Sequence, residues 1–91
     1  MDKVSACRLK NLLDICNFYK CGKYDIEEFK SRVGTALYPE PETEIARMFA
    51  TRVDIEYLME ELEGAIYAYG TEKAHKVADM LIDAINAVLK N

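Results

Sequence analysis

The stretch ETEIARMFATRVDIEYLMEELEGAIYAYG, residues 42–70, decides which fold the sequence predicts, because no helix-stop signal occurs in it before Gly70. Apolar residues recur along it at alternating spacings of three and four, the pattern of the buried seam of a bundle helix. We therefore expect one helix of roughly 28 residues, which would be about 42 Å long. Arg52 would be the one polar member of its seam. The expected seam consists of Ile45, Met48, Arg52, Ile55, Met59, Leu62, Ile66 and Tyr69.

A helical hairpin is expected before this stretch. The first helix runs from Lys3 to Tyr19 and is followed by Gly22, which suits a left-handed C-cap. The second helix has Asp25 as its N-cap and ends before Pro39, because proline biases the preceding residue away from the α region. The expected inward residues are Val4, Cys7, Leu9, Leu12, Leu13, Cys16 and Tyr19 in the first helix and Ile26, Phe29, Val33 and Leu37 in the second.

A last helix is expected from Thr71, its N-cap, to about Leu89. Short connections between consecutive helices favour antiparallel neighbours. The sequence therefore predicts an all-α fold: a single-domain antiparallel four-helix bundle over residues 1–91, with one long third helix. The inward residues of the last helix are expected to be Ala74, Val77, Leu81, Ala84, Ile85 and Val88.

Composition narrows the class of protein. The chain has 91 residues, of which 51% are hydrophobic and 31% charged, which is typical of an ordinary globular domain. No run of 18 apolar residues and no signal-peptide core occurs, so we expect a cytoplasmic protein without a membrane span. Three cysteines cannot form a closed disulfide framework, and their spacings match no zinc motif. Cys7 and Cys16 are expected to be small buried hydrophobes.

The net charge of −4 is unevenly distributed. Residues 1–37 hold seven Lys or Arg and five Asp or Glu, residues 38–70 hold two bases and eight acids, and residues 71–91 hold three of each. The excess of acid therefore belongs to the third helix and the segment before it. Because the bases of residues 1–37 are interspersed with acids, no basic face forms, and we expect no nucleic-acid binding.

One face of the third helix combines acids with aromatic residues. At about 100° per residue, Glu56, Glu60 and Glu63 fall close together beside the seam. They share the outward arc with four large apolar or aromatic residues. Phe49 and Val53 could form the interface of a homodimer or homo-oligomeric adaptor, or instead a second helix contact inside the bundle. The residues expected to bind a partner are Glu56, Tyr57, Glu60, Glu63 and Tyr67.

Like charges at i+3 and i+4 on this face cost about 0.2–0.5 kcal/mol per pair. Arg52 can relieve Glu56, but Glu60 and Glu63 have no basic neighbour on their own helix. Two interpretations remain open. Water, or bases of the first two helices, could balance the acids, or the face could bind a basic protein. Interleaved aromatic residues favour the second interpretation, because aromatic residues are enriched in binding surfaces.

Signatures of catalysis are weak. Glu72 and His75 form an E-x-x-H pair of the kind found in di-iron bundles, but the chain has only one histidine, whereas such sites use two. The stretch EELE, residues 60–63, is similar to the acidic magnesium cluster of all-α nucleotide pyrophosphohydrolases, but Gly64 and Lys76 stand where that family carries acids. No phosphate loop or nucleophile motif occurs. We expect a non-enzymatic protein with no catalytic residue, metal or cofactor, and an acidic metal-dependent hydrolase is the less favoured alternative.

The stretch LLDICNFYKCGKYDIEEFKSRV, residues 12–33, resembles the opening of small bacterial colicin-D-type immunity proteins. The shared pattern is a helix, a glycine-containing turn and an Ile-x-x-Phe helix with an arginine after it. This resemblance implies a four-helix immunity protein whose acidic surface occupies the basic active site of a ribonuclease toxin. The positions that carry it are Leu13, Phe18, Lys23, Ile26, Glu28, Phe29 and Arg32.

Overall fold

The computed structural model describes residues 3–37, 44–67 and 71–90, and these form five α-helices with no strand among them. The all-α prediction is confirmed, and the count of four helices is wrong. Predictions that concern Pro39, Tyr69 or Gly70 lie outside the described residues. The helices are α1 (Lys3–Lys20), α2 (Ile26–Leu37), α3 (Glu44–Arg52), α4 (Ile55–Tyr67) and α5 (Thr71–Lys90).

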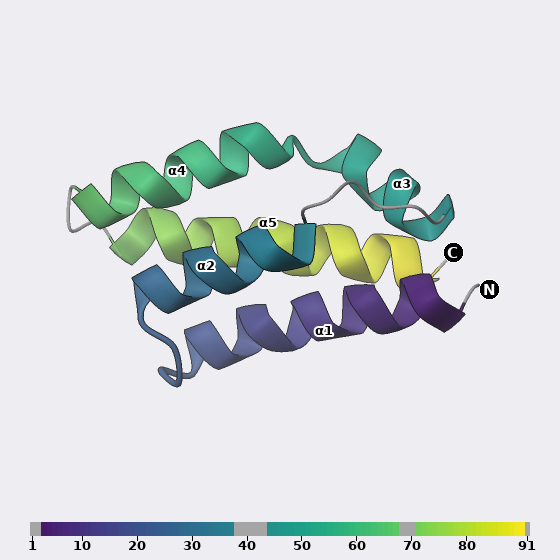
Figure 1. The fold of residues 1–91 in the computed structure, drawn as a ribbon, viewed down its shortest axis with the longest axis horizontal. Helices are drawn as coiled ribbons and strands as arrows, with labels where there is room; N and C mark the ends of the chain where they lie inside the picture. Colours follow the sequence, from purple (N-terminus) through teal and green to yellow (C-terminus); the bar gives the residue numbers. More distant parts are fainter. Residues whose placement is uncertain (1–2, 38–43, 68–70, 91) are drawn as a thin grey trace.

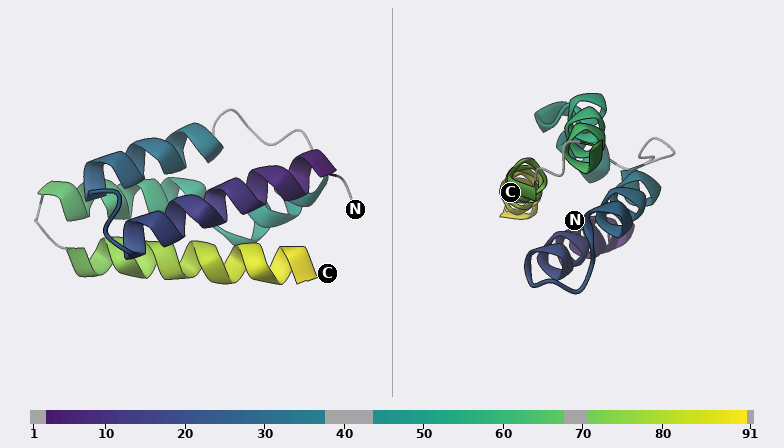
Figure 2. Two further views of the ribbon diagram at one scale, coloured as in Figure 1. Left: turned by 90° about the horizontal axis from the view of Figure 1, so that it is seen from below. Right: turned by 90° about the vertical axis from the view of Figure 1, so that its left-hand side faces the viewer.

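The helices α1 and α2, and α4 and α5, form antiparallel pairs around one core (Figure 1). Figure 1 shows α1 and α2 as a hairpin, and α4 and α5 as a second antiparallel pair. Helix α1 packs against α2, α3 and α5, while α4 packs against α2 and α5. In the end-on view of Figure 2, α3 and α4 lie on the same side of the bundle, one behind the other. One cluster of buried apolar side chains takes members from all five helices.

The turn between α1 and α2 follows the sequence closely. Gly22 has φ of +88°, and its amide donates to the Tyr19 carbonyl at 3.1 Å. The Lys23 amide donates to the Phe18 carbonyl at 2.9 Å, which completes a Schellman motif. The left-handed C-cap predicted at Gly22 is therefore confirmed.

Asp25 caps α2 as predicted. Its carboxylate Oδ1 accepts a hydrogen bond from the Glu28 amide at 2.8 Å. Helix α2 then continues through Gly34 to Leu37, burying Phe29 and Val33 completely. Phe29 stacks on Tyr19 of α1 with ring centroids 4.3 Å apart, which fixes the hairpin to the core.

The long third helix is the main error of the sequence prediction. The helix is interrupted at Val53 and Asp54, and Asp54 caps α4 by accepting from the Tyr57 amide at 3.1 Å. Aspartate favours this role over a helix interior because its side chain competes for backbone amides. In the last turn of α3, the Thr51 hydroxyl donates to the Met48 carbonyl at 2.7 Å.

Because of this break, the residues that are buried differ from the predicted seam. Of its described members only Leu62 is buried, whereas Met48 and Arg52 are exposed. The five-residue step from Val53 to Leu58 would rotate one continuous helix about 140° off its buried face, and the interruption absorbs that rotation. The residues actually buried are Ala46, Phe49, Val53, Leu58, Leu62 and Ala65.

Helix α1 differs from prediction near its start. Val4 is 62% exposed and Cys7 is exposed, so both were wrongly placed inside, while Ser5 is buried. Cys16 is fully buried as expected. In α5, the predicted inward stripe is confirmed except that Ala84 is only half-buried. No described helix has the length and apolar content needed to cross a membrane.

Candidate partner-binding face

Helix α4 presents an acidic and aromatic face to solvent. Glu56, Glu60 and Glu63 are exposed, and the side chains of Tyr57 and Tyr67 are 50% and 77% exposed. The outward orientation predicted for these five residues is therefore confirmed, while their role in binding stays a prediction. We call these five residues the α4 face.

The acids of the α4 face have no ion pair within the described part of the chain. The salt bridges found there join Lys20 to Asp79 and Arg32 to Glu28. Arg52 does not pair with Glu56, although the sequence suggested that it could. The like-charge repulsion between neighbouring glutamates, about 0.2–0.5 kcal/mol for each pair, is therefore not relieved by an ion pair to a described residue.

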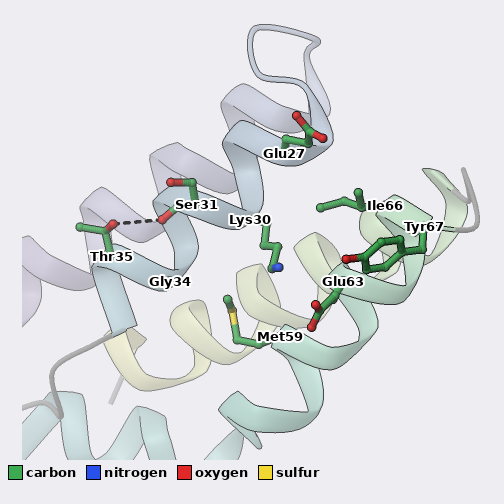
Figure 3. A pocket seen from close by; sticks show the side chains of 9 residues that line it. All are labelled: Glu27, Lys30, Ser31, Gly34, Thr35, Met59, Glu63, Ile66 and Tyr67. Carbon is green, nitrogen blue, oxygen red and sulfur yellow. Dashed lines mark hydrogen bonds between the residues drawn. The ribbon is translucent and has the colours of Figure 1, made fainter.

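An open groove runs between α2 and α4, with a volume of about 770 Å³. Figure 3 shows its two walls and the Lys30 ammonium lying between them, on the side facing Glu63. Lys30 of α2 thus faces one acid of α4 without forming an ion pair (Figure 3). The α2 wall consists of Glu27, Lys30, Ser31, Gly34 and Thr35, and the α4 wall of Met59, Glu63, Ile66 and Tyr67.

Gly34 lets the two walls approach each other. A Cβ atom built at Gly34 would lie 3.3 Å from Cε of Met59, closer than ordinary van der Waals contact. Sequence reasoning missed the α2 wall, because it considered Gly34 only as an alternative, earlier end of the second helix and gave it no packing role. A glycine inside an otherwise helical pattern can instead indicate close packing, and that signal was available.

Phe49 and Val53 do not belong to the exposed face. Their exposed fractions are 1% and 6%, and both contribute to the core of the monomer. Because α3 ends before α4 begins, the outward arc calculated for one continuous helix does not apply to them. The predicted oligomer interface through these residues is therefore corrected to a contact inside the bundle, the other option that the sequence left open.

Residues considered for catalysis are dispersed. Glu72 and His75 are exposed at the start of α5, and the His75 ring lies against Tyr19 with centroids 4.9 Å apart. Asp79 pairs with Lys20. Within residues 3–37, 44–67 and 71–90, no group of three or more His, Cys, Asp or Glu is placed to hold a metal ion.

The cysteines differ in burial. Burial, with a smaller contribution from Asp79, raises the pKa of the Cys16 thiol from 9.0 to about 12. Cys16 is therefore protonated at neutral pH and is unsuited to nucleophilic chemistry. Cys7 and Cys21 are exposed free thiols.

Comparisons with protein families, with curated proteins and with solved structures found no match to this chain.

Proposed function

We propose that this chain is a non-enzymatic binding protein of the immunity or antitoxin type, which uses the α4 face to bind a basic protein. The observation that carries the proposal is the exposure of three glutamates and two tyrosines on one 13-residue helix, without an ion pair to any described residue. The charge of the face is available to a partner because, among the described residues, none forms an ion pair with these acids and only Lys30 faces one of them, Glu63 (Figure 3).

Physical reasons connect such a face to inhibition of a nuclease. A nuclease active site is positively charged because its substrate is a polyanion, so carboxylates can occupy the subsites that phosphates would fill. Opposite charge also accelerates association, which benefits an inhibitor that must bind before the toxin acts. The tyrosines supply rigid contact area with a polar end, a combination enriched at interfaces.

The resemblance of residues 12–33 to colicin-D-type immunity proteins supports the same class. This segment forms the second half of α1, the glycine turn and most of α2. Its Glu28 and Arg32 form an i,i+4 ion pair, and Arg32 also lies over the Tyr24 ring. The segment is therefore an ordered hairpin beside the α4 face, since α2 packs against α4.

The test is capture of a partner from a lysate of the source cells at low salt. The bait carrying Glu56→Gln, Glu60→Gln and Glu63→Gln is compared with wild type. A matched bait carries Asp14→Asn, Glu72→Gln and Asp83→Asn, three exposed acids on other helices, so that both variants shift the net charge from −4 to −1.

The proposal predicts a basic protein that is captured by wild type and by the matched bait and is lost from the α4 bait. Its capture should weaken as salt rises, because exposed charges are screened. The identity of that protein, and whether it is a nuclease toxin, would follow from mass spectrometry. Equal capture by all three baits, or capture insensitive to salt, would overturn the proposal.

A further inference from the structure

We propose that the groove between α2 and α4 holds an apolar side chain of the partner, one flanked in its own chain by Lys or Arg. This inference rests on the proposed function, because it describes how a basic protein would dock beside the α4 face. The apolar contact in the groove is a second element of recognition, in addition to the charge of the α4 face.

The shape of the groove is suited to an apolar side chain. Gly34 leaves its part of the α2 wall without a side chain, and Met59 reaches toward that position from α4. Met59 and Ile66 are half-buried, so each still exposes apolar surface that a partner could cover. Figure 3 shows Ile66 and Tyr67 at one end of the groove and Met59 toward the other.

The charge of the groove favours a basic neighbour for that side chain. Glu27 stands on the α2 wall and Glu63 on the α4 wall, while Lys30 offsets one of the two carboxylates. Glu56 and Glu60 extend the negative charge along the exposed side of α4. A partner with Lys or Arg beside its apolar residue would meet these carboxylates, whereas an acidic partner would be repelled.

The volume sets the size of the occupant. About 770 Å³ falls within the range of roughly 300–1,000 Å³ typical of ligand pockets. The groove can therefore take one large side chain together with part of the backbone that carries it. Burial of such a side chain contributes about 1.5–3 kcal/mol, or at least about tenfold in affinity.

The experiment uses a displayed library of random peptides, selected on the full chain at low salt. Selected peptides are then measured by fluorescence anisotropy against three variants. Ser31→Trp adds bulk at an exposed position of the groove wall, and Asn86→Trp makes a comparable change at an exposed position of α5 outside the groove. The double variant Glu56→Gln, Glu60→Gln removes charge without altering the groove lining.

The inference predicts peptides that carry an apolar residue next to Lys or Arg. Their affinity should fall about tenfold or more with Ser31→Trp and stay unchanged with Asn86→Trp. If the affinity of the peptides falls with the double charge variant but not with Ser31→Trp, the groove is not the binding site. The role of the α4 face would then still be supported. Recovery of no binding peptide would count against both the groove and the α4 face as binding sites. So would peptides whose affinity changes neither with Ser31→Trp nor with the double charge variant. Circular dichroism of each variant separates loss of binding from loss of fold.

Discussion

The carboxylate Oδ1 of Asp54 lies 3.1 Å from the backbone nitrogen of Tyr57 and accepts its hydrogen bond. The Leu58 amide also donates to the Asp54 carbonyl, at 3.0 Å, as the first backbone hydrogen bond of the α4 turn. Asp25 makes the equivalent pair of contacts at the start of α2. Asp54 thus caps the first turn of α4 at the point where the predicted long helix is interrupted.

Replacing Asp54 by Ala should lower the free energy of unfolding by about 1 kcal/mol, because the first turn of α4 loses an amide partner. Asp54→Asn should lower it less, since asparagine also caps helices well. Urea denaturation followed by circular dichroism measures both. Asp83→Ala, at an exposed position within α5, is the control and should stay within about 0.5 kcal/mol of wild type. Equal effects of Asp54→Ala and the control would contradict the capping role.

The same three residues, Asp-Ile-Glu, begin with the capping aspartate at both helix starts, at 25–27 and at 54–56. The first was recognised as a helix start because Gly22 had already ended the preceding helix. No glycine or proline stands between Glu42 and Asp54, so the three-and-four spacing of apolar residues was extended across Asp54. Spacing alone could not reveal the break. Whether the segment forms one helix or two depends on which of its residues the other helices cover.

The exposed residues of α4 were easier to predict than the groove beside them. Glutamates leave water only at a large cost in free energy, so the outward position of Glu60 and Glu63 follows from residue type. The opposite wall is formed by α2, and its position depends on how two helices distant in sequence pack. Gly34 and Met59 carry that information only as a pair, because a Cβ atom at position 34 would lie 3.3 Å from Cε of Met59.

Phe49→Ala should lower the free energy of unfolding by about 3–5 kcal/mol, because it would leave a cavity in the core. Tyr57→Ala, on the exposed side of α4, should lower it by less than about 1 kcal/mol. Denaturation in urea measures the difference, and sedimentation velocity gives the association state of each variant. A Phe49→Ala protein of nearly wild-type stability but altered association would restore the interface that the sequence suggested.

Two glycines should respond to alanine in opposite directions. Gly64 is exposed inside α4 with no atom within 4 Å of an added Cβ, so Gly64→Ala should raise the stability by about 1 kcal/mol through helix propensity. Gly22 has φ of +88°, so Gly22→Ala should lower it by about 1–2 kcal/mol. Thermal and urea denaturation check both. Changes of the same sign at the two sites would contradict the assigned backbone conformations.

Alkaline pH should destabilise the protein through Cys16. In the unfolded chain this thiol ionises near its ordinary pKa of 9.0, whereas burial holds the pKa of the folded thiol at about 12. The unfolded state therefore releases a proton first, and the free energy of unfolding should fall as pH rises from about 9 to about 12, by at most about 1.4 kcal/mol per pH unit. Burial also raises the pKa of Tyr19 above 10.0, which acts in the same direction.

Cys16→Ala separates the contribution of this thiol from every other effect of alkaline pH, because wild type and variant share all of those. The variant should be less stable at neutral pH, because it loses a buried side chain, and its stability should decline less steeply above pH 9. The difference between the two unfolding free energies, measured by urea denaturation across this range, should therefore shrink as pH rises. A constant difference would show that Cys16 ionises equally readily in the folded and unfolded chain, and so that its thiol is not sealed from water by α1 and its neighbours.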